Sequence, residues 1–326
     1  MKLWAVLSLL VVALFLASLA IGHASLGPGA LIASLLPGGD PLARIVLLEL
    51  RLPRTILAAM IGASLGLCGA AMQGYLRNPL AEPGLIGVSG AAALGAVTAL
   101  QTGLVAAFAL ALPLAALTMA AAATGLILLL AGPRGGSLTL ILAGIAVSAF
   151  AGALTSLVLN LSPNPYAASE IVFWLMGSVA DRSLSHVWLA APLMLVGWGM
   201  LATLGRGLDA LTLGEDAAEA LGINLTRLRL TLLGGVAASV GAATAVAGAI
   251  GFVGLVVPHL LRPFVGAQPS RLLWASSLGG AAMLLAADLA VRLILPERDL
   301  KLGVVMALIG APLFLRLIAK TRAGLI

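Results

Sequence analysis

The sequence predicts an all-α protein that crosses a membrane about ten times. Three observations indicate this class: 61% of the 326 residues are hydrophobic, only 9% are charged, and apolar stretches of membrane length recur along the whole chain. An average soluble domain carries about 25% charged residues, so a soluble fold of this size could not bury so much apolar surface. We therefore expect lipid to be the solvent for most of the surface.

Ten stretches meet the length requirement for a membrane-spanning helix, which is about 20 mostly apolar residues. In order they are 3–22, 55–75, 84–102, 106–130, 138–160, 185–204, 231–249, 251–267, 271–295 and 303–319. The first is longer than the apolar core of about 7–15 residues in a signal peptide, so we expect it to be retained. Gly248 and Gly251 interrupt the stretch that holds the seventh and eighth spans, which could also be one long span.

Three connections are long enough to carry structure of their own. The first, 23–53, contains a Pro-Gly-Gly-Asp turn at 37–40 followed by a short amphipathic piece. The second, 161–184, begins with prolines that end the preceding helix, and a short surface helix is expected over 167–177. The third, 205–230, is the most polar part of the chain. We expect one transmembrane domain over residues 1–326, with 205–230 as a cytoplasmic segment within it.

The basic residues test this topology. The net charge of +6 could indicate nucleic acid, but sparse Lys and Arg in membrane proteins collect in cytoplasmic loops, so no nucleic acid is expected. With both termini in the cytoplasm, most of the 18 Lys and Arg fall on the inner side. Arg51, Arg54 and Arg292 are exceptions at outer helix ends. They indicate either an acidic partner that docks from outside or arginines that snorkel at the interface.

Few polar groups lie within the spans. Asp288 and Arg292 stand one helical turn apart and are expected to pair. An intramembrane acid is a candidate functional residue, so a proton-coupled secondary transporter that uses Asp288 is an alternative function. Ser148, Thr155 and Ser156 could line a transport pathway or bond to their own helix backbone. No span carries a nucleophile with a base or a metal-binding pattern, so an enzyme and a metal site are not expected.

Four motifs in order carry a family resemblance. They are Arg51-Leu-Pro-Arg54 with Gly62-Ala-Ser-Leu-Gly66 and Arg77 to Ser89, then Leu213 to Gly222, Gly248 to Arg262, and Leu302 to Pro312. Together they resemble the permease family of bacterial ATP-binding-cassette (ABC) importers for iron-siderophores, haem and vitamin B12.

The resemblance implies a type II ABC importer permease fold in the bacterial inner membrane. It implies import of an iron chelate, meaning a ferric siderophore or haem, or of vitamin B12 from periplasm to cytoplasm. The expected partners are a second copy or a close paralogue, two cytoplasmic ATP-binding subunits and a periplasmic substrate-binding protein. The chain has no Gly-x-x-x-x-Gly-Lys-Ser/Thr phosphate loop, so we expect ATP and Mg on the ATPase subunits and no cofactor on this chain.

The resemblance also implies roles for individual residues. Within 205–230 the residues themselves predict a short helix, because Glu215 and Asp216 suit the positive end of a helix that follows Gly214, and Gly222 would cap its end. It could be a solvated cytoplasmic helix or one whose small side chains enter a groove on another protein. The resemblance implies the second, with the ATPase subunit as partner; the residues of this ATPase-coupling segment are Leu213, Gly214, Glu215, Ala217, Ala218, Leu221 and Gly222. The residues implied for docking of the binding protein are Arg51, Arg54 and Arg292. The inner gate would consist of Asn78, Leu80, Ser137 and Leu138.

Overall fold

The computed structural model describes residues 2–22, 26–108, 110–132, 136–162, 165–294 and 300–322, and all the regular structure in these ranges is helical. Ten apolar helices correspond one to one with the ten expected spans, which confirms the all-α polytopic class. They are α1 (Lys2–Ala20), α4 (Leu52–Tyr75), α5 (Val88–Gln101), α7 (Ala111–Ala131), α8 (Ser137–Asn160), α10 (Leu184–Ala202), α13 (Leu225–Ala247), α14 (Val253–Leu261), α15 (Pro269–Ile294) and α16 (Leu302–Arg322).

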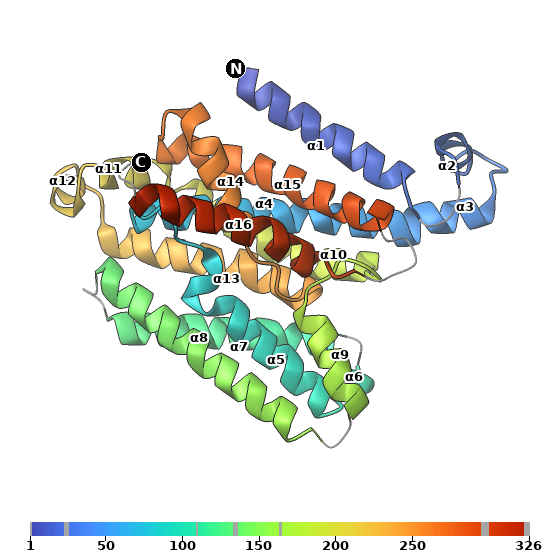
Figure 1. Cartoon of the computed structure of the whole chain (residues 1–326), viewed down its shortest axis with the longest axis horizontal. Coiled ribbons are helices and arrows are strands. Elements are labelled where there is room, and N and C mark those ends of the chain that lie inside the picture. Colours follow the sequence, from blue (N-terminus) through green and yellow to red (C-terminus); the bar gives the residue numbers. More distant parts are fainter. Residues whose placement is uncertain are drawn as a thin grey trace.

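Short helices occupy the connections. They are α2 (Pro28–Ala33), α3 (Pro41–Ile45), α6 (Leu104–Ala107), α9 (Pro165–Leu175), α11 (Gly205–Leu211) and α12 (Glu215–Ala220), with 3-10 turns at Pro83–Ile86 and Arg262–Val265. In Figure 1 the bundle has α12 at its left extreme and α2 and α3 at its right extreme. We call these the α12 end and the α3 end. Helix α9 is the short helix expected in the second long connection.

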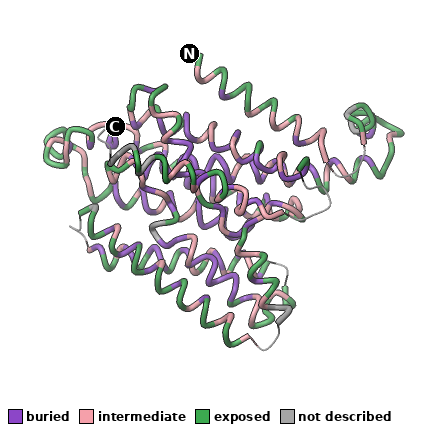
Figure 2. Tube along the Cα trace, in the orientation of Figure 1, coloured by how far each residue is buried: buried purple, intermediate pink, exposed green. Residues whose placement is uncertain are grey.

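Helix α4 forms the centre of the bundle. Most of its residues are buried, and they pack against α15, α14, α13 and α10 (Figure 2). Glycines allow the closest approaches: a Cβ on Gly62 would lie 2.2 Å from the carbonyl oxygen of Gly280, and one on Gly66 would lie 2.0 Å from that of Ser276. Helices in lipid associate through such small-residue faces, because the hydrophobic effect does not drive them together there.

A wide helical turn joins α3 to α4. Proline has no amide hydrogen, so Pro53 cannot bond to the carbonyl of Glu49. The backbone takes a π-helical turn over Val46–Arg51, and Leu52 N–H donates to the carbonyl of Leu47 instead. Residues 41–75 thus form one continuous helical stretch with Arg51 buried at the end of the wide turn.

Two of the ten helices are short because they begin inside the bundle. Helix α5 has 14 residues and α14 has nine. A Cβ on Gly254 would meet Pro83 at 2.7 Å and the carbonyl of Leu65 at 2.9 Å, so the start of α14 and the 3-10 turn before α5 lie beside the middle of α4. The segments 76–87 and 248–252 therefore run into the interior. Irregular backbone is tolerated at membrane depth only where protein buries it or a cavity surrounds it.

The region of the seventh and eighth spans consists of two helices, so the single long span is wrong. Helix α13 ends at Ala247, and Gly248 has a φ of +73°, a left-handed conformation that ends the helix without steric cost.

Candidate functional site

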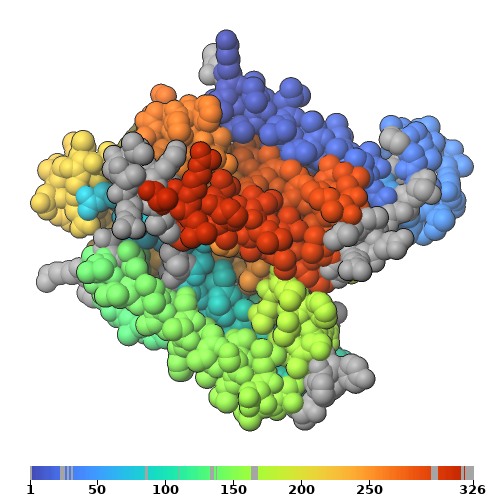
Figure 3. All heavy atoms as spheres, in the orientation of Figure 1, coloured from blue at the N-terminus to red at the C-terminus, as the bar shows by residue number. Residues whose placement is uncertain are grey.

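Helix α12 is a short, sharply bounded helix at the α12 end, where it projects from the bundle (Figure 3, yellow). Gly222, with a φ of +83°, closes it: Ile223 N–H donates to the carbonyl of Ala218 at 3.0 Å, and Gly222 N–H donates to that of Glu219 at 2.8 Å. These two bonds form a Schellman cap. Ala218 is fully buried, whereas Leu213 and Leu221 on either side of the helix are 69% and 63% exposed. Ala218 thus packs α12 against the bundle, while the leucines on either side of the helix point outward.

Two polar links join this segment to the bundle. The Asp209 carboxylate on α11 accepts hydrogen bonds from Gln268 Nε2 at 3.0 Å and from Ser270 N–H at 2.9 Å, where α15 begins. Arg77, in the turn after α4, lies 3.8 Å from Glu215 on α12, with both side chains nearly half exposed. An exposed ion pair of this kind contributes only about 0–1 kcal/mol to stability. Its main effect is to keep the turn after α4 close to α12.

The turn after α4 contains the first half of the predicted inner gate. Arg77 takes a left-handed conformation with a φ of 49°. The Asn78 side-chain oxygen accepts a hydrogen bond from Leu80 N–H at 2.9 Å, which is the local pattern that makes Asn favourable in turns. The Asn78 side chain therefore stabilises the turn that follows α4.

The second half of the predicted gate lies at the start of α8. Ser137 opens that helix, and its side chain is outside the described part of the structure, as are residues 133–135 before it. Leu138 is 67% exposed. Because α4 ends and α8 begins at the α12 end, the two halves share one end of the bundle (Figure 1).

Glu82 joins the two irregular segments inside the bundle. Its carboxylate accepts a hydrogen bond from Phe252 N–H, at the residue that immediately precedes α14. Phe252 has a φ of +67°, which is an outlier for a bulky side chain. The first N–H groups of a helix have no partner within it, and a carboxylate there also suits the helix dipole. Glu82 thus ties the turn after α4 to the start of α14.

Gln73 holds the same helix from the other side. Pro258 has no amide, so the carbonyl of Gly254 lacks its usual donor four residues later. The Gln73 side-chain NH₂ group donates to the carbonyls of Gly254 and Leu255 at 3.3 Å each. Arg262 donates to the Gln73 side-chain oxygen at 2.7 Å. This network explains why a glutamine is buried in the central helix.

The three candidate pathway hydroxyls on α8 differ in their surroundings. Thr155 is buried and donates to the carbonyl of Ala151 at 2.8 Å; Ser156 is exposed and donates to that of Gly152 at 3.0 Å. Ser148 has no hydrogen-bond partner among the described residues and faces Gly87, at the start of α5. Two of the three therefore bond to their own helix, and Ser148 lies beside the segment that enters the bundle.

The outer arginines Arg51 and Arg292 bind the last turn of α1. Arg51 donates to the carbonyls of Leu19 and Ala20 at 2.9 and 2.8 Å, and Arg292 donates to those of Ser18 and Ile21 at 2.9 and 3.1 Å. A helix C-terminus carries partial negative charge and unbonded carbonyls, which guanidinium groups satisfy well. Both residues are buried, with 4% and 5% exposed.

Asp288 connects the remaining outer arginine to this cluster. Its carboxylate pairs with Arg292, as the sequence predicts, and also with Arg54, whose Nε and Nη2 lie 2.9 and 2.8 Å away. The Arg54 side chain is 17% exposed, and Asp288 is 1% exposed. The three predicted docking residues are therefore close together but not equivalent: two bind α1, and one lies nearer to solvent.

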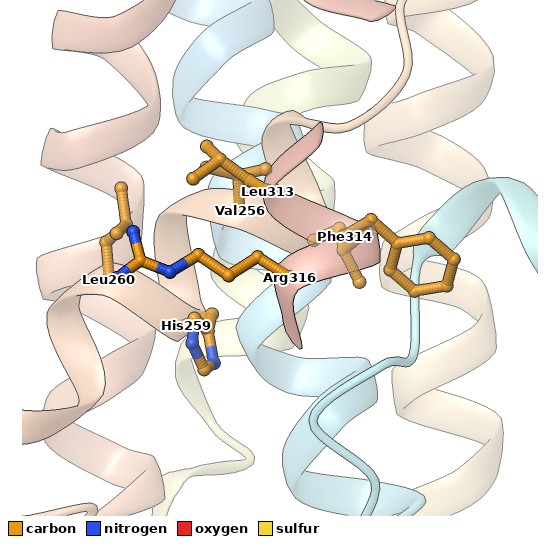
Figure 4. A pocket seen from close by; sticks show the side chains of 7 residues that line it. Val256, His259, Leu260, Leu313, Phe314 and Arg316 are labelled. Carbon is orange, nitrogen blue, oxygen red and sulfur yellow. The ribbon is translucent and has the colours of Figure 1, made fainter. Parts of the chain in front are cut away.

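A pocket of about 220 Å³ opens between α14 and α16 (Figure 4), in the half of the bundle nearer the α12 end (Figure 1). Its wall is apolar, and its polar groups are His259 and Arg316. The Arg316 side chain extends across the pocket toward Leu260, and the imidazole of His259 lies on α14 beneath it. A cation at this surface agrees with the expectation that this end faces the cytoplasm.

The bundle of ten apolar helices, with two helices that begin in its interior, defines a membrane-spanning transport subunit. Comparison with known proteins identifies the family of transport proteins to which it belongs. The model of the FecCD transport family matches residues 9–320, and the chain belongs to that family. It is an all-α permease subunit of an ABC importer; ATP is handled by the partner ATPase.

Curated relatives agree. The chain is 42% identical over 280 residues to the vitamin B12 import system permease protein BtuC of Vibrio cholerae, covering 83% of this chain and 82% of that one. It is 36% identical over 287 residues to the hemin transport system permease protein HmuU of Yersinia pestis, covering 84% and 83%.

A solved structure agrees as well. The chain matches, with a TM-score of 0.86 and 35% identity over 98% of this chain and 99% of the other, a structure described as an inward-facing conformation of an ABC transporter provisionally assigned to the metal-chelate type.

Proposed function

We propose that this chain is one of two membrane-spanning subunits that import an iron chelate or vitamin B12 across the bacterial inner membrane. The names of its relatives support this substrate range, since they include permeases for vitamin B12, hemin and ferric dicitrate. The second subunit is another copy or a close paralogue; FecC and FecD of Escherichia coli are two such relatives of this chain in one ferric dicitrate system. Both termini and the α12 end face the cytoplasm.

The observation that carries the proposal is the position of α12. The exposed Leu213 and Leu221 on either side of it offer a small apolar surface to an ATPase subunit, and Glu215 lies beside Arg77 in the turn that contains Asn78 and Leu80. Movement of α12 by the ATPase would therefore reach Asn78 and Leu80 through one short turn. The other end of that turn holds α14 through Glu82.

The proton-coupled alternative finds no support in the surroundings of Asp288. Its carboxylate lies between two guanidinium groups and is 1% exposed, which suits a fixed counter-ion better than a group that exchanges protons during transport. Family membership favours ATP as the energy source.

Reconstituted transport tests the proposal. The complex of this chain with its ATPase and binding protein is placed in proteoliposomes, and uptake of cyanocobalamin, hemin and a ferric siderophore is measured in parallel. We expect uptake of one substrate class with ATP and none with a non-hydrolysable analogue. Uptake driven by an ion gradient, in vesicles without the ATPase, would contradict the proposal.

A further inference from the structure

The turn from α12 into α13 is short and capped on both sides. Helix α12 ends at Ala220, and α13 begins at Leu225. Asn224 caps α13, because its side-chain oxygen accepts a hydrogen bond from Arg227 N–H at 2.8 Å. Together with the glycine cap of α12, this leaves no free loop between the two helices that could absorb a movement. A displacement of α12 is therefore passed to the first turns of α13.

Arg229 lies in the second turn of α13 and is buried, with 4% exposed. Its Nη2 donates a hydrogen bond to the carbonyl of Gly132 at 2.8 Å. Gly132 closes α7 with a φ of +65°, and its own N–H donates to the carbonyl of Leu128. A helix C-terminus carries unbonded carbonyls and partial negative charge, so a guanidinium group suits this position. Arg229 thus joins the beginning of α13 to the end of α7.

The end of α7 lies close to the second half of the predicted inner gate. Helix α8 starts at Ser137, shortly after Gly132 in the chain, and α7 and α8 pack against each other. Helix α13 begins, α7 ends and α8 begins at the α12 end of the bundle (Figure 1). The first half of the predicted gate has its own link to α12, through Glu215 and Arg77 in the turn after α4. One short helix is thus linked to both halves through two different arginines.

The two links differ in strength. Arg77 and Glu215 lie 3.8 Å apart, and both side chains are nearly half exposed, so water screens their attraction. The bond from Arg229 to Gly132 is 2.8 Å long and comes from a buried side chain. Hydrogen bonds in the low dielectric of a protein interior are electrostatically stronger than those in water. The link to α7 is therefore the firmer of the two.

We propose that Arg229 is a positioning residue of the transport cycle, which carries the displacement of α12 to the end of α7 and so sets the position of Ser137 and Leu138. The proposal rests on the proposed function, because it needs an ATPase that moves α12 and an inner gate at this end. If the gate does not follow α12, ATP is hydrolysed without import. An arginine that only stabilised the bundle would leave the ratio of hydrolysis to import unchanged in folded complexes.

The first measurement is this coupling ratio, the number of ATP molecules hydrolysed per substrate imported, in the proteoliposomes of the transport assay. Arg229→Met removes the donor and keeps an apolar side chain. We expect the ratio to rise about 2- to 30-fold, which corresponds to the range by which single residues change the coupling between sites. Arg229→Lys retains a donor and should restore part of the coupling. Arg227→Met, at an exposed arginine on the same helix, is the matched control and should keep the wild-type ratio.

Two fluorescent labels locate the defect along the chain. A bimane attached after Glu219→Cys reports movement of α12, and one attached after Leu138→Cys reports movement of the gate; both positions are exposed. Cys68 is buried and does not compete for the label. In the wild-type background, with cysteine-free partner subunits, ATP should change both emissions. In Arg229→Met the change at position 138 should be lost, while the change at position 219 should remain.

Equal coupling ratios and equal emission changes in Arg229→Met and Arg227→Met would overturn the inference. Loss of both emission changes in Arg229→Met would also overturn it, because Arg229 would then act on α12 itself. If Arg229→Met does not assemble, the same comparisons are made with Arg229→Gln and Arg227→Gln. These results leave the proposed function intact, which fails only if the wild-type importer takes up no substrate with ATP and a binding protein.

Discussion

Replacing Asp288 with Asn tests whether its carboxylate stabilises the fold or takes part in transport. The carboxylate is 1% exposed and is the counter-ion of Arg54 and Arg292. Removing one member of a buried ion pair costs about 3–5 kcal/mol, because the other charge is left uncompensated. Arg54 retains some access to solvent, but the side chain of Arg292 is only 2% exposed, so we expect the loss to fall within that range.

The free energy of unfolding, measured by SDS titration in mixed micelles, reports this loss. The double variant Asp288→Asn, Arg292→Gln should lose less than the sum of the two single variants, because the second change removes the unpaired charge; coupling of about 0.5–3 kcal/mol is typical of residues in contact. Substrate uptake per folded complex should stay close to wild type. The reasoning is refuted if Asp288→Asn unfolds like the wild type yet abolishes uptake, since Asp288 would then act in transport.

Three further predictions concern stability and coupling. Gly66→Ala should lower the free energy of unfolding by at least about 1–3 kcal/mol, because the new Cβ lies 2.0 Å from the Ser276 carbonyl and α4 must move away from α15 to reach the 3.4 Å of an ordinary contact. Gln73→Leu should cost about 1–3 kcal/mol in the same assay, because the Gly254 carbonyl loses its donor. Gly222→Ala should weaken stimulation of ATP hydrolysis by the binding protein, since an alanine at a φ of +83° costs about 1–2 kcal/mol and loosens the cap of α12.

Each of these has a matched control. Gly74→Ala, in the same helix as Gly66, meets only side chains at 3.5 Å and should be nearly neutral. Gln101→Leu removes an amide whose buried oxygen has no hydrogen-bond partner in the described part of the chain, so it should cost less than Gln73→Leu. Gly199→Ala in α10 meets nothing within 4 Å and should keep ATPase stimulation. A variant that behaves like its control would count against the contact assigned to it.

Hydropathy and length were enough to predict which parts of the chain form helices. All ten expected spans contain an apolar helix, because a 20-residue apolar run has few alternatives in lipid. The starts of α5 and α14 were not predictable in the same way. Their positions depend on Gly69 and Gly254, where a Cβ on Gly69 would lie 2.0 Å from the Gly254 carbonyl oxygen, and no local pattern reports contacts between distant segments.

The site was predictable to a similar extent. The helix dipole and the glycine cap of α12 are local features, so the sequence alone predicted that helix. The charge bias singled out Arg51, Arg54 and Arg292, and one helical turn predicted the pair of Asp288 with Arg292. The sequence did not predict that Arg51 and Arg292 bind the end of α1, because this contact depends on how α1, α4 and α15 pack together. Gln73 and Glu82 were missed, although a proline in α14 was a signal that some side chain must satisfy a carbonyl.

The clamp on α1 has a consequence for how the protein is made. Helix α1 has few buried residues, and its firmest polar attachment in the described structure is its last turn. Ser18 and Arg292 are 274 residues apart, so the ribosome completes α1 long before α15. Until then the carbonyls of Ser18 and Ile21 lack Arg292 as their donor, and α1 lacks its packing against α15. Packing of α1 against α15 is therefore a late step of biogenesis, and a quality-control protease would recognise a chain in which it has not occurred by a first helix that is detached from α15.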